Sequence, residues 1–351
     1  QVKSSKNICV NKKEVNMAIV LDAMGSDEFP VPEILASIEL ASQGEKVILV
    51  GKKDLLLKKL NSMRINNFPV EIIDAPDIVE MTDKPVESFR QKPNNSMAVG
   101  IRLVQQGQAD AFVTAGNTGA AAFNAITTLR RLPGVSRPAL AALIPTKVKK
   151  CVFMDTGVNA DCRPDFLLEF AILGSAYSSK VFGIQSPKVG LLSIGEEAEK
   201  GSQLVKDAFK LLQSSDLNFY GNVEPKEVYA GMVDVVVTDG FSGNVFIKSS
   251  EAVGKLVSET LKSNISKSIF SMLGYLLAKP AFNNLKRMMD PSETGAAILL
   301  GVNGLVFIGH GRSDSRALIS AVKLARRTVD NNLMGEIKAQ IQAKLNTDNP
   351  E

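Results

Sequence analysis

Short uninterrupted apolar runs recur along this 351-residue chain, and segments with helical spacing lie between most of them. A strand with one solvent-facing side alternates apolar and polar residues, whereas a strand buried on both sides does not. Continuous runs are therefore typical of a mostly parallel sheet covered by helices on both faces. We expect an α/β fold with strands at 17–23, 46–51, 70–76, 109–115, 139–145, 151–155, 188–195, 233–239 and 305–310.

Helical spacing predicts helices at 53–63, 95–108, 163–183 and 201–215. Residues 1–16 are polar and are interpreted as an N-terminal extension, and no Pro/Gly-rich linker divides the remainder. We therefore predict one catalytic α/β unit over 17–345. Functional loops of such sheets gather at the carboxyl ends of the strands. The polar motifs described next all follow strands, so we expect them to share one rim.

Two strand-to-helix turns share the pattern Thr-x-Gly-x-[Ser/Thr]-Gly. Thr114, Gly116, Thr118 and Gly119 of the first correspond to Thr238, Gly240, Ser242 and Gly243 of the second, and Asn117 and Asn244 add an amide to each. Glycines let the backbone approach a ligand, and free N–H groups at a helix start attract anions. We predict that these turns bind phosphate or stabilise an oxyanion. The alternative is that they are packing turns capped by Thr118 or Ser242.

Further polar residues end or follow strands. Asp22, Asp155 with nearby Asn159, and Asp239 either cap the next helices or converge in one polar site. Lys248 is expected on the same helix face as Asn244, where an ammonium group can hold phosphate. His310, the only histidine, ends a strand between two glycines, and this position favours a functional role.

Composition limits the chemistry that is available. One histidine and three scattered cysteines disfavour a His-rich metal centre, a disulfide framework and a structural zinc site, so we predict no metal. A net charge of +4 permits an acidic partner, but no nucleic-acid motif appears, and we predict no nucleic-acid binding. We find no signal peptide and no apolar run long enough to span a membrane, and we expect a cytoplasmic protein.

The segment 261–289 differs in character from the rest of the chain. It carries five positive charges, Lys262, Lys267, Lys279, Lys286 and Arg287, and no acidic residue. It is more apolar than a surface helix requires, notably at Ile269, Phe270, Leu273, Leu276 and Leu277, and Pro280 is expected to start a second helix. Such a basic amphipathic hairpin lies at an anionic membrane surface or forms a dimer interface, or does both.

Taken together, these motifs resemble the PlsX family of phosphate acyltransferases, which move a fatty acyl chain from acyl carrier protein to inorganic phosphate. The segments that carry the resemblance are AIVLDAMGSD, TAGNTGA, PGVSRPALA, MDTGVNADCRPDFLLEFAILGSAY, VGLLSIGEEAEKG, DGFSGNVFIKSSE and LLGVNGLVFIGHGRSDSRA, in that order. Three positions depart from the usual pattern: Glu28 replaces a histidine, Ser26 a second glycine and Arg312 a small residue.

The resemblance implies a three-layer α/β/α, Rossmann-like fold related to isocitrate and isopropylmalate dehydrogenases and to phosphotransacetylases. It also implies a homodimer at the cytoplasmic membrane, no cofactor, and an acyl phosphate product used by a membrane glycerol-3-phosphate acyltransferase in phospholipid synthesis. The predicted catalytic residues are Asn117, Lys248, His310 and Asp22. Gly116, Thr118, Gly119, Asp155, Asn159, Asp239, Gly240, Ser242, Gly243 and Asn244 are predicted to bind phosphate or the thioester.

Phosphate is already an anionic oxygen nucleophile at neutral pH, so positioning and oxyanion stabilisation are expected to provide most of the catalysis. We expect direct transfer without an acyl-enzyme, with His310 protonating the thiolate that leaves. The nearest rival reading is a soluble phosphotransacetylase that uses short acyl-CoA. A nicotinamide-dependent decarboxylating dehydrogenase and a non-enzymatic membrane scaffold are less favoured by these motifs.

Overall fold

The structure is a computed structural model that describes residues 18–289, 291–293 and 295–348. Within these ranges eleven strands form one sheet in the order β3-β2-β1-β4-β11-β10-β5-β6-β9-β7-β8. The strands are β1 (Ile19–Asp22), β2 (Val47–Gly51), β3 (Glu71–Asp74), β4 (Ala111–Thr114), β5 (Ala139–Pro145), β6 (Lys150–Met154), β7 (Val189–Leu192), β8 (Phe219–Val223), β9 (Val235–Val237), β10 (Ala297–Leu300) and β11 (Leu305–Ile308). Every strand expected from the sequence is present. The predicted extension 1–16 lies outside the described residues.

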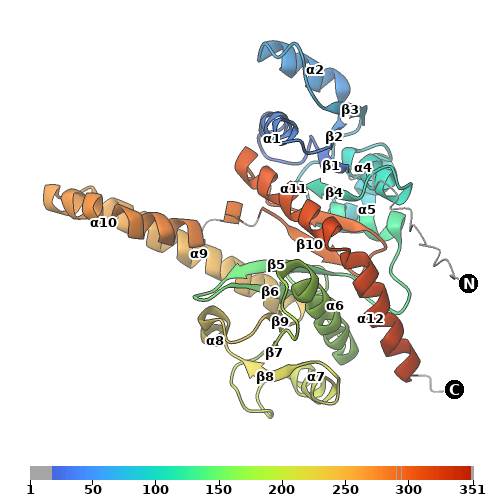
Figure 1. Ribbon diagram of the computed structural model, residues 1–351, viewed down its shortest axis with the longest axis vertical. Coiled ribbons are helices and arrows are strands. Elements are labelled where there is room, and N and C mark those ends of the chain that lie inside the picture. The colour runs from blue at the N-terminus through green and yellow to red at the C-terminus, as the bar shows by residue number, and fades with distance from the viewer. Residues whose placement is uncertain (1–17, 290, 294, 349–351) are drawn as a thin grey trace, which may run out of the picture.

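Helices cover both faces of this sheet (Figure 1). They are α1 (Val31–Ser42), α2 (Lys53–Ser62), α3 (Pro85–Gln91), α4 (Ser96–Gln105), α5 (Thr118–Leu129), α6 (Pro164–Phe182), α7 (Gln203–Gln213), α8 (Pro225–Ala230), α9 (Gly240–Ile265), α10 (Ile269–Met289), α11 (Ser315–Asp330) and α12 (Leu333–Asp348), with a short 3-10 helix η1 (Pro291–Glu293). The predicted three-layer α/β/α class is confirmed.

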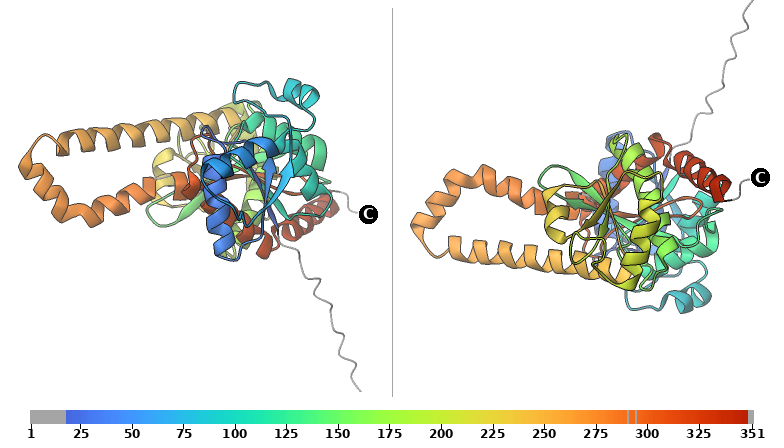
Figure 2. Two further views of the ribbon diagram at one scale, coloured as in Figure 1. Left: turned by 90° about the horizontal axis from the view of Figure 1, so that it is seen from above. Right: turned by 90° about the horizontal axis from the view of Figure 1, so that it is seen from below.

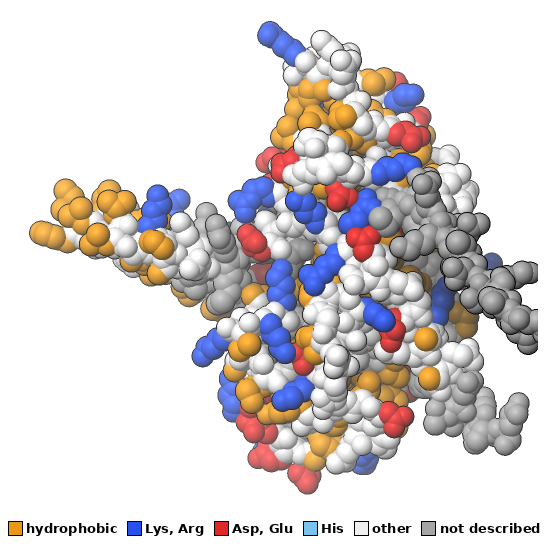
Figure 3. Space-filling view, viewed as in Figure 1, with side chains coloured by type: hydrophobic (Ala, Val, Ile, Leu, Met, Phe, Trp, Pro, Cys, Tyr) orange, Lys and Arg blue, Asp and Glu red, His pale blue; other side chains and the backbone are white. Residues whose placement is uncertain are grey.

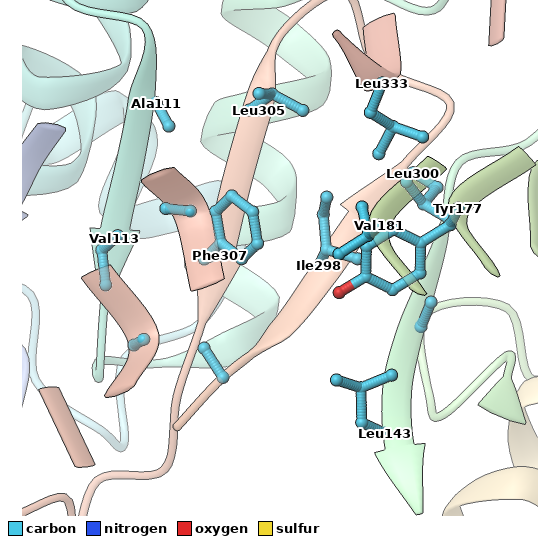
Figure 4. Packing of buried hydrophobic residues seen from close by; sticks show 14 of the residues in the cluster. Ala111, Val113, Leu143, Tyr177, Val181, Ile298, Leu300, Leu305, Phe307 and Leu333 are labelled. Carbon is cyan, nitrogen blue, oxygen red and sulfur yellow. The ribbon is translucent and has the colours of Figure 1, made fainter. Parts of the chain in front are cut away.

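Successive side chains of the central strands enter different apolar layers. Leu21 packs in a cluster with α1, α6 and α11, whereas Val20 packs in a second cluster with α4 and α5. Figure 4 shows part of the first cluster, where Phe307 and Ile298 of β11 and β10 face Tyr177 of α6. Burial on both faces is the physical reason why the strand sequences are continuous apolar runs.

The strands do not all run in the same direction, and this changes where the polar turns lie. β10 pairs antiparallel with both β11 and β5, and β5 pairs antiparallel with β6. The remaining pairs are parallel. As a result, β6 and β9 run opposite to β1, β4 and β11. The turns after β6 and β9 are at the other edge of the sheet, so the prediction of a single shared rim was wrong.

Two strands escaped prediction for local reasons. β8 contains Tyr220, Gly221 and Asn222 and lies at the end of the sheet, so it has no continuous apolar run. β10 has only four residues and is joined to β11 by a short turn, without a helix between them. A four-residue run next to another strand carries no periodicity that distinguishes strand from helix.

α9 and α10 form an arm that extends away from the sheet (Figure 1; Figure 2). Phe246 fixes the early part of α9, because its ring stacks on Phe153 at 4.7 Å and on Tyr229 at 5.6 Å between centroids. The hairpin turn lies at 266–268, so the first helix of the hairpin starts at Gly240, well before residue 261. Pro280 lies inside α10 and does not begin a helix. That prediction was wrong because an interior proline removes one helical hydrogen bond without always ending the helix.

Candidate active site

Three turns at the carboxyl ends of β1, β4 and β11 pack directly against one another. These strands are neighbours in the sheet and run parallel. The Asp27 N–H donates to the Gly311 carbonyl oxygen at 2.6 Å, which joins the turns after β1 and β11. A Cβ on Gly25 would lie 2.9 Å from the backbone nitrogen of Gly116. Glycine at position 25 therefore lets the turns after β1 and β4 touch.

A buried chain of hydrogen bonds supports the turn after β4. The Asp22 carboxylate accepts from the Thr114 hydroxyl at 2.7 Å and from the Met24 N–H at 2.9 Å. Thr114 Oγ1 in turn accepts from the Gly116 N–H at 2.9 Å. Burial raises the pKa of Asp22, and these donors oppose the rise. Asp22 is only 1% exposed, so its carboxylate acts on the site through Thr114.

A second buried carboxylate, Glu33 of α1, supports the turn after β1. Its Oε1 accepts from the Ser26 N–H at 3.1 Å. Burial raises the pKa of Glu33 to about 7. Sequence reasoning missed Glu33, because it lies inside an amphipathic helix and no motif surrounds it. A fully buried acidic residue next to a strand-end aspartate is visible only once the fold is known.

Asn117 caps α5 and ties it to the loop before α3. Its Oδ1 accepts from the Ala120 N–H at 3.0 Å, and its Nδ2 donates to the carbonyl oxygens of Met81 and Asp83, both at 3.0 Å. Both ends of the amide are therefore engaged within the protein, and Asn117 positions the turn. The capping residue is Asn117 and not Thr118, because Thr118 is already inside the helix.

The first N–H groups of α5 lack acceptors. Within the described part of the chain no hydrogen bond is made by the backbone N–H groups of Thr118 or Gly119, and both residues are exposed. A Cβ on Gly119 would lie 2.8 Å from Pro85 Cγ. Free N–H groups at a helix start, together with the positive end of the helix dipole, attract an anion. This turn has the properties of a phosphate or oxyanion site.

His310 follows β11 and contacts α9. Its Nε2 lies 3.2 Å from Glu251 Oε1, and Lys248 Nζ lies 3.1 Å from Glu251 Oε2. Burial lowers the pKa of His310, Glu251 opposes this effect, and Lys248 and Arg312 reinforce it. The imidazole is therefore neutral at pH 7. The contact with Glu251 favours the tautomer that carries its hydrogen on Nε2, which leaves Nδ1 as an acceptor.

Sequence reasoning missed Glu251 and grouped Lys248 with Asn244. Glu251 follows Lys248 by one helical turn, so an acidic residue at i+3 of the candidate lysine was the available signal. Lys248 lies where α9 passes His310. The Asn244 side chain remains near Gly157, whose Cβ would lie 3.5 Å from it.

The second group of predicted residues lies at the opposite edge of the sheet. The Asp155 carboxylate is buried and accepts from the backbone N–H groups of Leu140, Gly157, Val158 and Asn159 at 2.7 to 3.3 Å. The Asn159 side chain adds a bond of 2.9 Å to it. Burial raises the pKa of Asp155, and these donors oppose the rise. The carboxylate thus organises the loop after β6.

α9 begins in tight contact with that loop. The Gly240 N–H donates to the Asn159 carbonyl oxygen at 2.7 Å. A Cβ on Gly243 would lie only 1.9 Å from the Asp155 carbonyl oxygen. These contacts match the alternative that the second turn is a packing turn. Binding of phosphate or thioester by this group stays a prediction.

The two turns that match in sequence are not equivalent in structure. α5 begins after Asn117, beyond the first glycine of its motif, whereas α9 begins at Gly240, the first glycine itself. Asp239 caps α9 by accepting from the Ser242 N–H at 2.8 Å, so Ser242 is not the cap. The shared Thr-x-Gly-x-[Ser/Thr]-Gly pattern therefore arises from two different helix starts.

Two features are absent from the described residues. No group of three or more His, Cys, Asp or Glu side chains there is close enough to hold a metal ion. None of the helices in the described ranges combines the length and the hydropathy that crossing a bilayer requires.

Comparison with known proteins agrees with the sequence motifs. The family model described as "Fatty acid synthesis protein" matches residues 17–335. A phosphate acyltransferase of Elusimicrobium minutum is 43% identical over 327 residues, which cover 93% of this chain and 96% of that protein. A phosphate acyltransferase of Acidobacterium capsulatum is 42% identical, with 93% of this chain and 97% of that protein covered.

Solved structures of similar fold include two phosphotransacetylases. The enzyme from Streptococcus pyogenes has a TM-score of 0.60 at 20% identity, and EutD from Staphylococcus aureus has 0.57 at 19%; each comparison covers 90% of this chain and 94% of the other. A 4-hydroxythreonine-4-phosphate dehydrogenase from Klebsiella pneumoniae has a TM-score of 0.51 at 16% identity, and the comparison covers 88% of this chain and 98% of that protein. These likenesses concern the fold alone. The match to the family model and to the relatives over most of their length shows that the chain belongs to the fatty acid synthesis protein (PlsX) family, whose members are phosphate acyltransferases.

Proposed function

We propose that this enzyme transfers a long-chain fatty acyl group from acyl carrier protein to inorganic phosphate and releases acyl phosphate. The observation that carries the proposal is the open start of α5. The N–H groups of Thr118 and Gly119 lack acceptors in the described chain, and the turns after β1 and β11 pack beside it. Family membership supplies the reaction class.

Phosphate is assigned to the α5 start, where two N–H donors and the helix dipole face it. Asp22, Thr114 and Asn117 hold these donors in place from behind. A rigid backbone donor site needs no reorganisation when charge develops in the transition state. In this proposal Asn117, Asp22 and Gly116 position the site, and Thr118 and Gly119 contact the anion.

His310 is assigned the proton that must move during transfer. A phosphate oxygen attacks the thioester carbonyl carbon, a tetrahedral oxyanion forms, and the carbon–sulfur bond breaks. The O–H proton of hydrogenphosphate passes to His310 Nδ1 and then to the leaving thiolate, which departs as a thiol. Glu251 holds the ring through Nε2, 3.2 Å away, in the manner of a carboxylate that orients a catalytic imidazole. Lys248 contributes positive charge near the phosphate.

The donor is proposed to be acyl carrier protein. The chain carries a formal net charge of +4, which favours association with an acidic partner and predicts weaker binding at higher salt. A phosphotransacetylase-like enzyme acting on acyl-CoA is the second candidate, and the similar folds of the solved phosphotransacetylases are the observation behind it. The two differ in donor and not in chemistry.

The test is acyl phosphate formation, measured as hydroxamate after hydroxylamine trapping, with phosphate and either long-chain acyl carrier protein or acyl-CoA. We expect turnover with the carrier protein and little with acyl-CoA. Lys248→Ala should lower kcat/KM for phosphate. Lys255→Ala is the matched control, because Lys255 is also exposed on α9 and paired with a glutamate, Glu259, at 3.8 Å. Turnover with short acyl-CoA alone would establish the second candidate. An acylated protein formed without phosphate would refute direct transfer.

The arm is proposed to bind the anionic surface of the cytoplasmic membrane and a second copy of the chain, through different residues. Ile269, Phe270, Leu273, Leu276 and Leu277 at its tip are 56 to 86% exposed. No acidic residue lies between 261 and 289, which suits anionic lipid. Phe241, Val245 and Leu256 on α9 are exposed apolar side chains, and Leu256 lies beside the Lys255–Glu259 ion pair, a mixture that suits a protein partner. The product would pass to a membrane glycerol-3-phosphate acyltransferase.

Paired substitutions separate these two surfaces. Phe270→Asp with Leu277→Asp should abolish flotation with anionic liposomes and leave the molecular mass in solution unchanged. Phe241→Asp should leave flotation with anionic liposomes unchanged and lower the molecular mass in solution from that of a dimer to that of a monomer. Loss of both properties in either variant would contradict the division of the arm.

A further inference from the structure

A cavity of about 360 Å³ lies on a different part of the molecule from the proposed active site. It is open to solvent and bordered by the β5–β6 turn, the end of α6, η1 and α11, and none of its lining residues belongs to the three turns described above. Its lining residues are Leu143, Lys149, Lys150, Phe182, Ile184, Glu293, Ser320, Leu324 and Arg327. Small-molecule sites start at about 300 Å³. The cavity is thus large enough for a small ligand.

Three cationic residues, Lys149, Lys150 and Arg327, line the cavity against one acidic residue, Glu293, so the lining carries net positive charge. Lys149 pairs with Asp234. In contrast, no carboxylate of the described residues lies within ion-pair distance of Lys150 or Arg327. Lys150 Nζ instead donates to the backbone carbonyl oxygen of Glu293 at 3.2 Å.

The two unpaired cations are close enough to affect each other. Burial lowers the pKa of Lys150, Glu293 partly offsets this, and Arg327 lowers the pKa further. Lys150 and Arg327 are both exposed residues, so solvent screens part of their mutual repulsion, and an anion placed between them would remove the rest. The face that carries α11 shows a gathering of Lys and Arg side chains near the root of the arm (Figure 3). The local field therefore favours an anionic ligand.

The other side of the cavity is apolar. Leu143, Phe182, Ile184 and Leu324 line it. The Arg327 guanidinium lies over the Phe182 ring at 5.3 Å from its centroid, so the charged and apolar sides meet at this pair. Inorganic phosphate would leave the apolar wall uncovered, and a neutral hydrocarbon would leave the two cations unpaired.

From this arrangement we propose a second binding site for an amphiphilic anion, meaning a carboxylate or phosphate group on a short apolar chain. The anionic group lies between Lys150 and Arg327, and the apolar chain covers Phe182 and Leu324.

The site is also linked to the arm. Glu293 belongs to η1, the segment through which α10 returns to the sheet, and its carbonyl oxygen competes with the ligand for Lys150. Occupancy therefore changes the bonding at the root of the arm.

Isothermal titration with octanoate, octyl phosphate, inorganic phosphate and octanol tests this proposal on the full chain. Phosphate is also expected at the α5 start, so the binding assigned to the cavity is the part of each isotherm that Lys150→Gln removes. Octanoate and octyl phosphate should each show such a component, and comparing them distinguishes a carboxylate from a phosphate as the preferred group. Phosphate and octanol should bind the cavity at least about tenfold more weakly than octanoate and octyl phosphate, because each satisfies only one side of the cavity. Equal binding of phosphate and octyl phosphate would refute the apolar half of the site.

Variants identify which site is occupied. Lys150→Gln and Arg327→Gln should each weaken octanoate binding by about tenfold or more. Lys323→Gln should leave it unchanged, because Lys323 is an exposed lysine of α11 that does not line the cavity. Ser320→Leu fills the cavity while keeping both cations, and it should also abolish octanoate binding. Lys248→Ala should have no effect. The proposal is overturned if octanoate binds Lys150→Gln and Arg327→Gln as it binds the wild type, or if Lys248→Ala removes the binding.

Discussion

Replacement of Gly243 by alanine tests the contact that fixes the start of α9. The added Cβ would lie 1.9 Å from the Asp155 carbonyl oxygen, whereas ordinary van der Waals contact begins near 3.4 Å. The obstacle is backbone, and it belongs to a loop whose own N–H groups are bound to the Asp155 carboxylate. Neither partner can turn away as a flexible side chain would. The helix must therefore move by more than an ångström.

A displacement of this size has two measurable effects. The free energy of unfolding should fall by about 3 kcal/mol or more, which lies at the upper end of the range for overpacking of a well-filled region. The movement also withdraws Glu251 from His310, because Glu251 lies on α9 whereas His310 follows β11. We expect kcat to fall by about tenfold or more even in the fraction that remains folded.

Urea unfolding followed by circular dichroism and the hydroxamate assay measure these two effects. Gly274→Ala is the matched control. Gly274 also lies in the arm, and a Cβ there has nothing within 4 Å, so this variant should gain up to about 1 kcal/mol of helix propensity and keep its activity. If Gly243→Ala unfolds within about 0.5 kcal/mol of the wild type, α9 does not pack on the loop after β6 as described.

Three further outcomes follow from the site. Because neutral His310 is the proposed base, kcat/KM should fall as the pH drops through the lowered pKa of His310. Glu251→Gln should move this acid limb of the pH profile to lower pH, and Lys248→Ala should move it to higher pH. Shifts of both variants in the same direction would contradict the assignment. Asn117→Ala removes the α5 cap and the bonds to the 80–83 loop. It should lower the free energy of unfolding by about 1 to 2 kcal/mol and raise the KM for phosphate. An unchanged KM for phosphate would show that the cap does not support the phosphate site. For Glu33 the folded state keeps a proton that the unfolded chain loses, so stability should decline as the pH rises from 4.5 to about 7, and Glu33→Gln should flatten this slope in denaturant titrations across the window.

Local patterns predicted the strands and the fold class because burial on both faces leaves a direct trace in the sequence. Asp22 shows how far that reasoning extends. Its place at a strand end was visible, but its isolation from solvent behind Thr114 was not. The sequence also did not reveal whether each pair of strands is parallel or antiparallel. A short antiparallel strand, β10, and the hairpin of β5 and β6 reverse half of the sheet, and no residue in the turns after β6 or β9 records that reversal.

The composition of the site was harder to predict for the same reason. Glu251 and Glu33 lie on helices, and their partners are distant in the chain: Glu251 reaches His310, and Glu33 reaches the Ser26 turn. Contacts of this kind depend on where a helix crosses the sheet. The motif pattern could place Asn117 and Thr118 at a helix start, but which of them caps the helix depends on the exact residue at which the helix begins.

The length of α9 gives the arm a mechanical property. Gly240 is held at one edge of the sheet, Glu251 lies eleven residues further along, and the helix continues to Ile265. The helix is also held at Phe246, whose ring stacks on Phe153 and Tyr229. At about 1.5 Å per residue, Glu251 is about 8 Å beyond Phe246 and Ile265 about 28 Å beyond it. If α9 behaves as a rigid rod that pivots at Phe246, a sideways movement of about 5 Å at its far end displaces Glu251 by about 1.3 Å. A displacement of this size is enough to break the hydrogen bond between Glu251 and His310. A force on the distant end of the arm therefore reaches His310 through the rotation of one rigid helix, without rearrangement of the side chains between them.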